Sequence, residues 1–469
     1  MALVLIGFMG AGKTTLAREL GGVDTDDLLA ERAGESVEAF FDRVGEIEFR
    51  AAEREVVAAA LASDAGVVAL GGGAVEADHD LGGHTVAWLE VDEDTAWTRA
   101  AGAGRPLARD REQFAARFAH RGPLYEALAD IHVLPGGRLG PERPATGEKL
   151  ILSPVHPVWV GRAPERRDGD FVLSDEHVAP LHAEGAFAIA PGEEHKTLAT
   201  AERVWSAMAR AGITRSGRVV AVGGGVVGDV AGFCAATYQR GIPVVHVPTT
   251  LVAQVDSAYG GKTGVDLPEA KNYVGAYHQP EAVHVLPDTL RTLPAAERSA
   301  GYAEVVKTGL IAGGPLWERV RGGAVDDPAT VLACARTKLA IVAADERDAG
   351  LRQVLNLGHT VGHAIETVTG YGRYRHGEAV ALGLLVALRL SGQDALRTEV
   401  AGLLAAQGLP TRLAGGDADA EAIVAATHRD KKRTGASTPF VLVEAVGRVT
   451  PGHVVEAADV LAAVQELLA

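Results

Sequence analysis

Residues 218–229 read RVVAVGGGVVGD: an apolar strand, a run of three glycines and the start of a helical pattern. A glycine turn between a strand and a helix lets the backbone approach a pyrophosphate closely. The turn is not the dinucleotide fingerprint GxGxxG, so it is weak evidence for a nucleotide when taken alone. What it does indicate is one strand-to-helix step of an α/β fold.

The sequence on both sides repeats this step. Strand-like runs at 158–160, 171–173, 186–190, 219–222 and 244–247 alternate with helical patterns, which predicts a parallel sheet with crossover helices. From about Leu293 onward helical periodicity dominates, with a short strand-like return at 440–443. We therefore predict an α/β domain over 157–292 and a mainly helical domain over 293–469.

The N-terminal third is separated from these domains by a composition break. Proline and glycine interrupt any helix between 134 and 157, and we expect a linker over 141–156. Before it, residues 1–140 have the pattern of a small α/β domain: strands at 3–7, 67–70 and 85–89, a helix from Lys13, and further helices over 35–62 and up to Ala129.

Composition excludes some classes of partner. The chain has 469 residues, enough for two to four domains, and a formal net charge of −16. Such a charge disfavours nucleic acid and anionic membrane surfaces. The two cysteines, Cys234 and Cys334, lie in apolar contexts, and the N-terminus lacks a basic signal region. We expect a cytoplasmic protein that acts on small molecules.

A phosphate-binding loop is predicted near the N-terminus. Residues 7–14, GFMGAGKT, follow a strand and open a helix, as in loops that cradle nucleotide phosphates. Backbone N–H groups of Gly10, Ala11, Gly12 and Thr15 would receive the phosphates, Lys13 would reach the outer ones, and Thr14 would bind Mg²⁺. The fold and the loop together predict a site for phosphate groups.

Polar residues further along the chain indicate what kind of substrate accepts the phosphate group. Asp24 and Asp26 alternate along an extended segment, so one could orient Mg²⁺ and the other a substrate hydroxyl. The stretch between Lys13 and Asp24 is short and leaves room for about two helical turns. Further candidates for binding an anion are Arg50, the glycine triplet 71–73, Arg105 and Arg121.

A metal site is predicted in the helical domain. Residues 355–380, LNLGHTVGHAIETVTGYGRYRHGEAV, hold His359 and His363 on one helical face, with His376 after a turn. Upstream, Glu304 lies in an apolar-periodic run where a carboxylate needs a partner. Two imidazoles, one carboxylate and an open fourth position are the pattern of a catalytic zinc site.

Residues 1–140 resemble shikimate kinase through the phosphate loop, the paired aspartates, the glycine triplet and the arginines named above. The resemblance implies that Lys13 and Thr14 bind ATP and Mg²⁺, that Asp24 supports the metal, and that Asp26 acts in catalysis. It assigns shikimate binding to Asp26, Arg50, Gly72 and Arg121, a lid over the phosphates to Arg105, and a nucleotide contact to Arg138.

Residues from about 154 to the end resemble 3-dehydroquinate synthase. The motifs PGEEHKTL, GGGVVGDVAGF, PTTL, VDSAYGGKTG, KNYVGAYHQP, AEVVK, LNLGHTVGHAIE, HGEAVALG and DKKRTG occur in the family's order. The resemblance implies that Glu304, His359 and His376 hold Zn²⁺ or Co²⁺ and that His363 is the acid–base residue. Arg240 resembles an arginine that reaches into a neighbouring subunit, which implies a homodimer.

The same resemblance assigns the remaining positions. It implies NAD binding by Asp175, Glu193, Lys196, Gly225, Val226, Val227, Gly228, Asp229, Thr249, Thr250, Lys262, Lys271, Thr289 and Thr292. The substrate's phosphate and carboxylate would fall to Lys262, which is also a catalytic candidate, and to Asn272, Lys338, Arg352, Asn356 and one of Lys431 or Lys432.

The implied activities are two steps of aromatic amino acid biosynthesis. One is phosphorylation of shikimate by ATP. The other is cyclisation of 3-deoxy-D-arabino-heptulosonate 7-phosphate to 3-dehydroquinate and phosphate. In this reaction NAD⁺ accepts a hydride from the substrate and later returns it. Two alternatives remain: another sugar-phosphate cyclase or glycerol-dehydrogenase-like enzyme with the same metal triad, and an N-terminal unit that binds nucleotide for regulation without kinase turnover.

Overall fold

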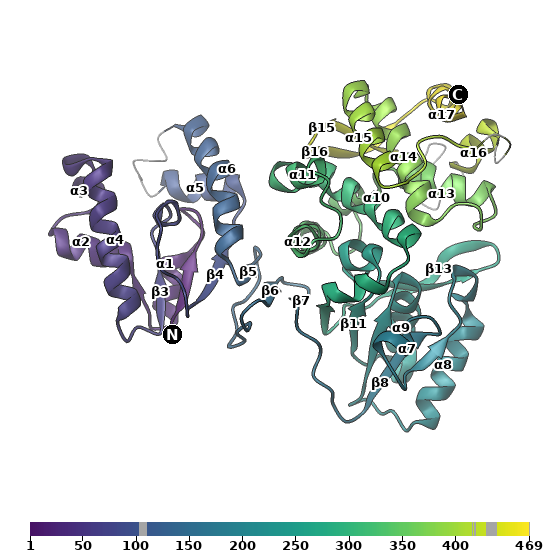
Figure 1. The fold of residues 1–469 in the computed structure, drawn as a ribbon, viewed down its shortest axis with the longest axis horizontal. Helices are drawn as coiled ribbons and strands as arrows, with labels where there is room; N and C mark the ends of the chain where they lie inside the picture. Colours follow the sequence, from purple (N-terminus) through teal and green to yellow (C-terminus); the bar gives the residue numbers. More distant parts are fainter. Residues whose placement is uncertain (103–109, 415, 417–418, 428–438, 469) are drawn as a thin grey trace. The chain divides into compact units, whose positions relative to one another are not determined.

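The computed structural model describes residues 1–102, 110–414, 416, 419–427 and 439–468. The chain divides into two compact units, Met1–Trp159 and Val160–Ala469 (Figure 1). Each unit contains parallel strands and an apolar core of its own, as expected of separate domains. Among the described residues, none of the helices combines the length and apolar character that crossing a membrane requires.

The N-terminal unit is a parallel α/β domain. Its strands follow the order β2-β3-β1-β4-β5-β6, and each pairing is parallel. One face packs against α4, α5 and α6 through Val57, Ala96 and Phe114, and the other packs against α1 through Ala17. The strands are β1 (Leu3–Ile6), β2 (Val23–Asp24), β3 (Val67–Ala69), β4 (Thr85–Leu89), β5 (Ile131–Val133) and β6 (Lys149–Leu152). The helices are α1 (Lys13–Glu19), α2 (Thr25–Ala33), α3 (Val37–Val44), α4 (Glu46–Ala62), α5 (Glu93–Gly102) and α6 (Arg111–Leu128), with the 3₁₀ turn η1 (Ala74–Glu76).

Two expectations for this unit are resolved by the structure. Helix α1 has seven residues, so the short stretch before Asp24 does hold two helical turns. The expected linker over 141–156 contains strand β6, which pairs with β5 through Ile131 and Leu150. Pairing across a long loop leaves little local pattern in so short a strand, which is why the sequence did not indicate it.

The C-terminal unit begins with a second set of parallel strands. Its strands are parallel and follow the order β14-β11-β10-β8-β9, so β9 is added on one side of β8 and the later strands on the other side. Val219 and Ala221 face the core under α8 and α9, whereas Val220 and Val222 face the opposite side, so β10 is buried on both faces. The strands are β8 (Asp170–Asp175), β9 (Phe187–Ile189), β10 (Arg218–Gly223), β11 (Val244–Pro248) and β14 (Ala282–Val285), and β7 (Pro157–Val160) lies at the unit boundary. The helices are α7 (Ala179–His182), α8 (Leu198–Arg210) and α9 (Gly225–Thr237), with the short turns η3 (Glu193–His195), η4 (Tyr238–Arg240), η5 (Ala253–Ser257) and η6 (Pro287–Thr292).

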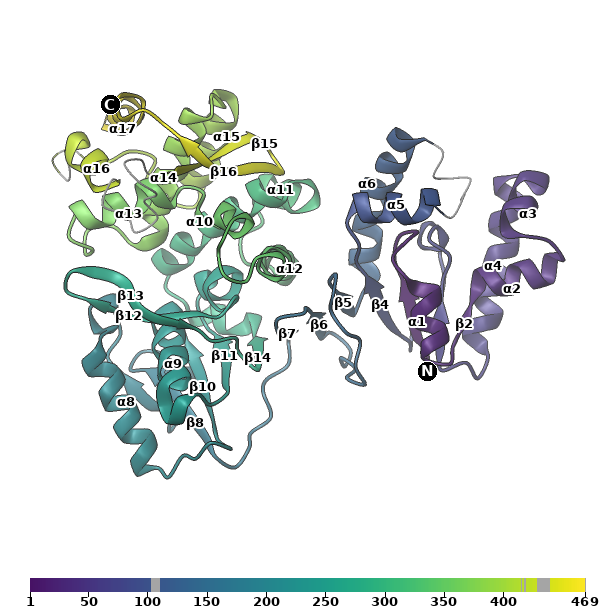
Figure 2. The ribbon, with the colours of Figure 1, turned by 180° about the vertical axis from the view of Figure 1, so that it is seen from behind.

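Helices make up most of the remainder of this unit, as predicted. They are α10 (Ala295–Ala312), α11 (Gly314–Arg321), α12 (Pro328–Ala344), α13 (His359–Val368), α14 (His376–Leu390), α15 (Asp394–Ala406), α16 (Ala420–Thr427) and α17 (Ala457–Leu468), with η7 (Leu351–Asn356). In Figure 2 the hairpin β12 (Lys262–Leu267) and β13 (Ala270–Tyr277) lies between the α/β part and the helices of this unit.

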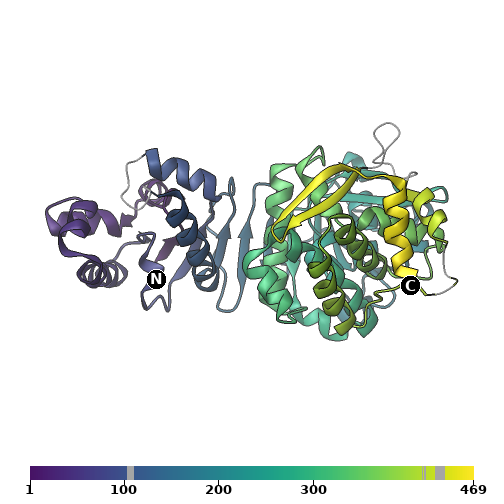
Figure 3. The same ribbon diagram turned by 90° about the horizontal axis from the view of Figure 1, so that it is seen from above.

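A second hairpin differs from the sequence-based expectation. The predicted strand near 440–443 is β15 (Pro439–Ala445), and it pairs with β16 (Arg448–Val454). Pro451 and Gly452 inside β16 weaken the strand pattern, which explains why this strand was missed. Figure 3 shows the pair running across the helical part toward α17.

Candidate active sites

The residues of the predicted metal site lie on three helices. Glu304 is in the middle of α10, while His359 and His376 are the first residues of α13 and α14. Gly358 has a left-handed φ of 78°, which glycine adopts without strain, and it turns the chain into α13. A Cβ on Gly377 would lie 1.8 Å from the carbonyl oxygen of Ala300, so α14 begins directly against α10.

These three side chains converge on one point. The Nε2 atoms of His359 and His376 lie 3.5 Å and 3.3 Å from Oε1 of Glu304, and the candidate ligand atoms are all within 4.8 Å of one another. Glu304 is fully buried, so its charge needs cationic partners. Two nitrogens and one carboxylate oxygen fit a divalent metal such as zinc, with a position left for water or substrate.

The second nitrogen of each ring is also held in place. Nδ1 of His359 lies 3.1 Å from the carbonyl oxygen of Leu357, and Nδ1 of His376 lies 3.5 Å from Oε2 of Glu366. Such partners fix the tautomer and leave Nε2 free to bind a metal. Glu366 was not predicted from the sequence. Its position seven residues after His359, on the same face of α13, was the available signal.

The electrostatics of the triad without metal keep Glu304 ionised and His376 protonated. Burial raises the pKa of Glu304, but the charges of Lys307 and His359 outweigh it and hold that pKa well below its usual range. Burial lowers the pKa of His359. Burial also opposes the charge of His376, yet hydrogen bonds to Glu304 and Glu366 raise its pKa to about 10. A bound metal would therefore replace one proton, on His376.

His363 lies beside the triad, one helical turn after His359. Its ring centroid is 5.3 Å from that of His359 and 6.0 Å from that of His376. His363, Glu366 and His376 form a second cluster whose candidate ligand atoms lie within 4.8 Å of one another. The two clusters share His376, which faces Glu304 through Nε2 and Glu366 through Nδ1.

Buried cations lie next to Glu304. Lys307 forms ion pairs with Glu304 and, at 3.4 Å, with Oδ1 of Asp256. Lys338 donates to the same Oδ1 at 2.8 Å and to the Asp256 carbonyl oxygen at 2.7 Å. Burial raises the pKa of Asp256, but the two lysines outweigh it and lower that pKa to about 2. Lys307 was missed, although its spacing of three residues from Glu304 places both on one helical face.

The other expected substrate-binding residues are held by the backbone or by acids. Arg352 is buried and donates to the carbonyl oxygens of Glu346 at 2.6 Å and Gly260 at 2.9 Å. Lys262 forms an ion pair with Asp348, and Asn356 donates to the Gln353 carbonyl oxygen at 3.0 Å. Lys431 and Lys432 lie outside the described residues.

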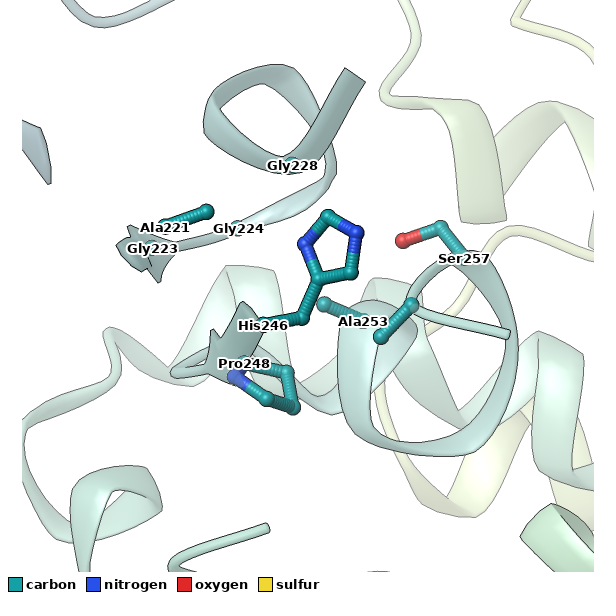
Figure 4. Close-up of a pocket in the computed structure, with 9 residues that line it drawn as sticks. Ala221, Gly223, Gly224, Gly228, His246, Pro248, Ala253 and Ser257 are labelled. Atoms are coloured by element: carbon teal, nitrogen blue, oxygen red, sulfur yellow. The ribbon is translucent and has the colours of Figure 1, made fainter. Parts of the chain in front are cut away.

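A candidate nucleotide crevice lies where strands β10 and β11 end. A pocket there is lined by the glycine turn, His246 and Ser257, and Figure 4 shows the His246 ring between Gly228 and Ser257. The first turn of α9 has no side-chain cap, so the N–H groups of Gly225, Val226 and Val227 can donate to a phosphate. The Gly228 N–H already donates to the Gly224 carbonyl oxygen at 3.0 Å. The carboxyl ends of parallel strands are where such sheets bind nucleotides.

Two threonines follow β11 at this crevice. A Cβ on Gly224 would lie 2.8 Å from Cγ2 of Thr250, so glycine is needed for the close approach. Thr250 Oγ1 accepts from the Ala253 N–H at 3.2 Å. The buried Thr249 hydroxyl has no hydrogen-bond partner within the described part of the chain, which leaves it available to a ligand.

An ion-pair network extends from the crevice to the metal triad. Nζ of Lys196 lies 2.8 Å from Glu193, 3.2 Å from Asp229 and 2.8 Å from the side-chain oxygen of Asn272. Nζ of Lys271 lies 3.7 Å from Glu193 and 3.4 Å from Oε1 of Glu366. Glu366 in turn contacts His376, so the hairpin β12–β13 links the nucleotide side to the metal side.

The remaining predicted NAD positions have local contacts. Asp175 accepts from the N–H groups of His177 and Val178, both at 2.9 Å. Thr289 accepts a hydrogen bond from the buried Gln254 amide at 3.0 Å, and the Thr292 hydroxyl lies 2.7 Å from Nε2 of His182.

Arg240 stands on an exposed turn with unusual backbone geometry. Gln239 and Arg240 have φ values of 48° and 70°, a left-handed conformation that costs energy for residues with a Cβ.

The N-terminal unit has the predicted phosphate loop. Gly10 and Gly12 have φ values of 85° and 92°, and α1 begins at Lys13 with no side-chain cap. Nζ of Lys13 donates to the carbonyl oxygens of Gly7 at 2.7 Å and Phe8 at 3.2 Å, so the ammonium group lies within the loop. Thr14 and Thr15 follow in the first turn of α1.

The two aspartates lie at the start of α2. Oδ1 of Asp24 accepts from the Asp26 N–H at 2.8 Å and caps the helix. Oδ1 of Asp26 would lie 2.7 Å from a Cβ on Gly71, so its carboxylate faces the glycine triplet. A Cβ on Gly72 would lie 3.3 Å from the Met9 backbone nitrogen, which places the triplet against the phosphate loop.

Two of the predicted arginines converge beside the same triplet. A Cβ on Gly73 would lie 2.5 Å from Nη2 of Arg50 and 3.0 Å from Nη2 of Arg121. Arg138 is exposed in the turn after β5, and Arg105 lies outside the described residues. Glu76, which sequence reasoning did not single out, contacts both guanidinium groups.

These sites define a kinase-type unit with a phosphate-binding loop and a second α/β unit with a candidate metal site formed by two histidines and one glutamate. Comparisons identify the families. Residues 9–139 match the model of the shikimate kinase family, residues 186–300 that of the 3-dehydroquinate synthase N-terminal domain, and residues 301–433 that of its C-terminal domain.

Curated relatives support the same assignment. The 3-dehydroquinate synthase of Halorhodospira halophila is 47% identical over 309 residues, which cover 60% of this chain and 85% of that protein. The 3-dehydroquinate synthase of Synechococcus is 44% identical over 296 residues, covering 59% and 80%. The chain belongs to the 3-dehydroquinate synthase family and carries a fused shikimate kinase domain. It thus combines two activities of the shikimate pathway, as predicted.

Solved structures show the same fold for the C-terminal unit. A 2-deoxy-scyllo-inosose synthase in complex with carbaglucose-6-phosphate, NAD⁺ and Co²⁺ has a TM-score of 0.60 at 26% identity, covering 67% of this chain and 97% of that one. A 2-epi-5-epi-valiolone synthase from Streptomyces hygroscopicus with NAD⁺ and Zn²⁺ bound has a TM-score of 0.60 at 22% identity, covering 70% and 99%.

Proposed function

We propose that the C-terminal unit converts 3-deoxy-D-arabino-heptulosonate 7-phosphate to 3-dehydroquinate and phosphate at the Glu304, His359 and His376 triad. The observation that carries this proposal is the convergence of both Nε2 atoms on one buried carboxylate oxygen. The identity of 47% to a 3-dehydroquinate synthase favours this activity over that of the other sugar-phosphate cyclases.

The residues fit a divalent metal and NAD. Zn²⁺ or Co²⁺ would be held by the triad and NAD by the first turn of α9, and together they supply Lewis-acid stabilisation of oxyanions and a reversible hydride acceptor. The named relatives with NAD⁺ and Co²⁺ or Zn²⁺ support this choice.

The chain's own residues then have separate tasks. His363, beside the triad, accepts the proton of the hydroxyl that is oxidised. Lys338 and Arg352 are buried cations that bind and orient the phosphate and carboxylate of the substrate. Lys271 holds Glu366, and Glu366 keeps His376 in the tautomer that presents Nε2.

Phosphate release tests this assignment. The purified chain with NAD⁺ and zinc should release phosphate from the heptulosonate phosphate and form 3-dehydroquinate. Absence of release at saturating cofactor would reject it in favour of another cyclase or dehydrogenase activity.

For the N-terminal unit, we propose that Lys13, Thr14 and Asp24 bind Mg²⁺ and ATP and that Asp26 accepts the proton of the shikimate hydroxyl. Arg50 and Arg121 then bind the shikimate carboxylate, since paired guanidinium groups suit that geometry. In a coupled assay, ADP formation should depend on shikimate. Binding of ATP with no shikimate-dependent ADP would instead favour a regulatory nucleotide module.

The assembly and the compartment are also proposals. Arg240 is exposed on a strained turn, which fits a residue that is ordered by a second copy of the chain. Light scattering on the purified chain should give the mass of a dimer. The free, buried cysteines Cys234 and Cys334 are consistent with a reducing cytoplasm.

A further inference from the structure

The carboxylate of Glu76 lies between the two arginines assigned to shikimate. Oε1 of Glu76 is 2.9 Å from Nε of Arg121, and Oε2 is 3.0 Å from Nη2 of the same residue. Nη2 of Arg50 lies 3.5 Å from Oε2. This is the two-pronged geometry by which a guanidinium group binds any carboxylate.

Both arginines have anchors other than Glu76. The guanidinium group of Arg121 lies 5.8 Å from the centre of the Phe8 ring, and the side chain is 4% exposed. Nη1 of Arg50 donates to Oε2 of Glu53 at 2.7 Å. The arginines are therefore positioned by the core, and their contact with Glu76 is a separate interaction.

Glu76 itself is ionised and can move. Burial raises its pKa, but the hydrogen bond and charge of Arg121 and the charge of Arg50 outweigh it, so the pKa lies below its usual value. The side chain is 28% exposed and belongs to the last residue of the short turn η1. Because the side chain is partly exposed, a change of rotamer toward solvent would release both guanidinium groups.

We propose that Glu76 is a resident competitor for the substrate carboxylate. In the free enzyme it occupies the two-arginine subsite and pairs both guanidinium groups, and a substrate carboxylate must displace it to bind. A neutral analogue forms no ion pairs to replace those between Glu76 and the two arginines. Glu76 therefore increases the selectivity of the site for an anionic substrate. This inference rests on the proposed shikimate kinase function.

Substitution of Glu76 should lower the Michaelis constant for shikimate if Glu76 competes with the substrate, and should raise it if Glu76 holds the arginines in place. Glu76→Gln and Glu76→Ala are made in the full-length chain, and the Michaelis constant for shikimate is measured at saturating ATP and Mg²⁺. Competition predicts that this constant falls about 3- to 10-fold while the turnover number changes less than about 2-fold. A residue that holds the arginines in place would give a higher constant, and that result, or no change, overturns the inference.

Glu46→Gln is the matched control. Its carboxylate lies 3.9 Å from Nη2 of Arg50 but is 69% exposed and contacts no second arginine among the described residues. Removing it lowers the local negative charge by the same amount without emptying the subsite. An equal fall in this control would mean that general charge, not competition, is responsible, and would overturn the inference.

Calorimetric titration separates failure of this inference from failure of the proposed kinase. If the unsubstituted chain forms no shikimate-dependent ADP, the kinase proposal fails, and the dissociation constant of shikimate then tests Glu76 alone. Tighter binding in Glu76→Gln supports competition, whereas unchanged or undetectable binding rejects it. Equal ATP affinity in all variants shows that the unit is folded.

Discussion

His376 contacts a carboxylate through each nitrogen of its ring: Glu304 at Nε2 and Glu366 at Nδ1. Glu304 is placed to share a metal, while Glu366 orients the ring and increases its basicity. Lys271 neutralises the outer side of Glu366. The triad therefore depends on residues that never reach the metal position.

Removing the charge of Glu366 tests this dependence. Glu366→Gln keeps the side-chain volume but weakens the contact with His376, so we expect zinc affinity to fall about 10- to 100-fold. A chelator-competition titration measures it. Glu399→Gln is the control because Glu399 contacts Arg321 on the surface. Unchanged affinity in Glu366→Gln would contradict the assigned role.

The raised pKa of His376 predicts a pH dependence. Because that pKa is about 10 without metal, zinc displaces one proton throughout the neutral range. Zinc affinity should rise about tenfold per pH unit between about pH 7 and 8.5. Two histidines of ordinary pKa would give a nearly flat profile there, and a flat profile would contradict the geometry.

The same proton affects the stability of the metal-free protein. The folded pKa of His376 is raised from 6.5, so its contribution to the free energy of unfolding is fully present below about pH 6.5. It is lost as the pH rises toward 10. Metal-free protein should accordingly lose stability over this range, in a denaturant titration at several pH values.

At this scale, sequence reasoning found the residues with rare chemistry. Three histidines within eighteen residues and a glutamate in an apolar helix are unusual enough to indicate a metal. A charged residue on a helix or turn is normally solvated, so the sequence did not single out Glu366, Lys307 or Glu76. Their roles depend on partners from distant segments, which no local pattern reveals.

At the scale of elements, the α10–α14 contact sets the metal geometry. Gly377 allows α14 to begin against the backbone of α10, next to Glu304. Gly377→Ala would force the helices apart, and we expect it to reduce zinc affinity and to cost about 1–3 kcal/mol of unfolding free energy.

Gly402→Ala is the matched control for that substitution. Gly402 lies in α15, and an added Cβ would meet nothing within 4 Å. We expect this change to stabilise the protein by about 0.5–1 kcal/mol, since alanine favours a helix over glycine. Equal effects of the two substitutions on zinc affinity and on thermal unfolding would contradict the role given to the helix contact.

Elements with strong periodicity were predictable and those defined by pairing were not. The strands around residues 3, 85, 219 and 244 and the helices that carry the histidines agree with expectation. Strands β6 and β16 and the hairpin β12–β13 are short or contain glycine and proline, so their assignment depends on partners.

At the scale of the whole molecule, the two sites lie in different compact units. His359→Ala should abolish cyclase activity and leave shikimate-dependent ADP formation within about twofold, because the kinase residues are untouched. Lys13→Ala should do the reverse. Both assays on each variant measure this, and parallel loss of the two activities would show that the units act as one.

Domain order was predictable because each unit has its own nucleotide motif and sheet pattern. Oligomeric state and the identity of the metal depend on surfaces and affinities, which no local sequence pattern encodes.

Anomalous diffraction at the zinc edge, from crystals of the full-length chain grown with zinc, tests the central claim most directly. We predict one strong peak bonded to Nε2 of His359, Nε2 of His376 and the Glu304 carboxylate, at about 2.0–2.2 Å. A peak held instead by His363 and Glu366, or no peak at the triad, would contradict the account.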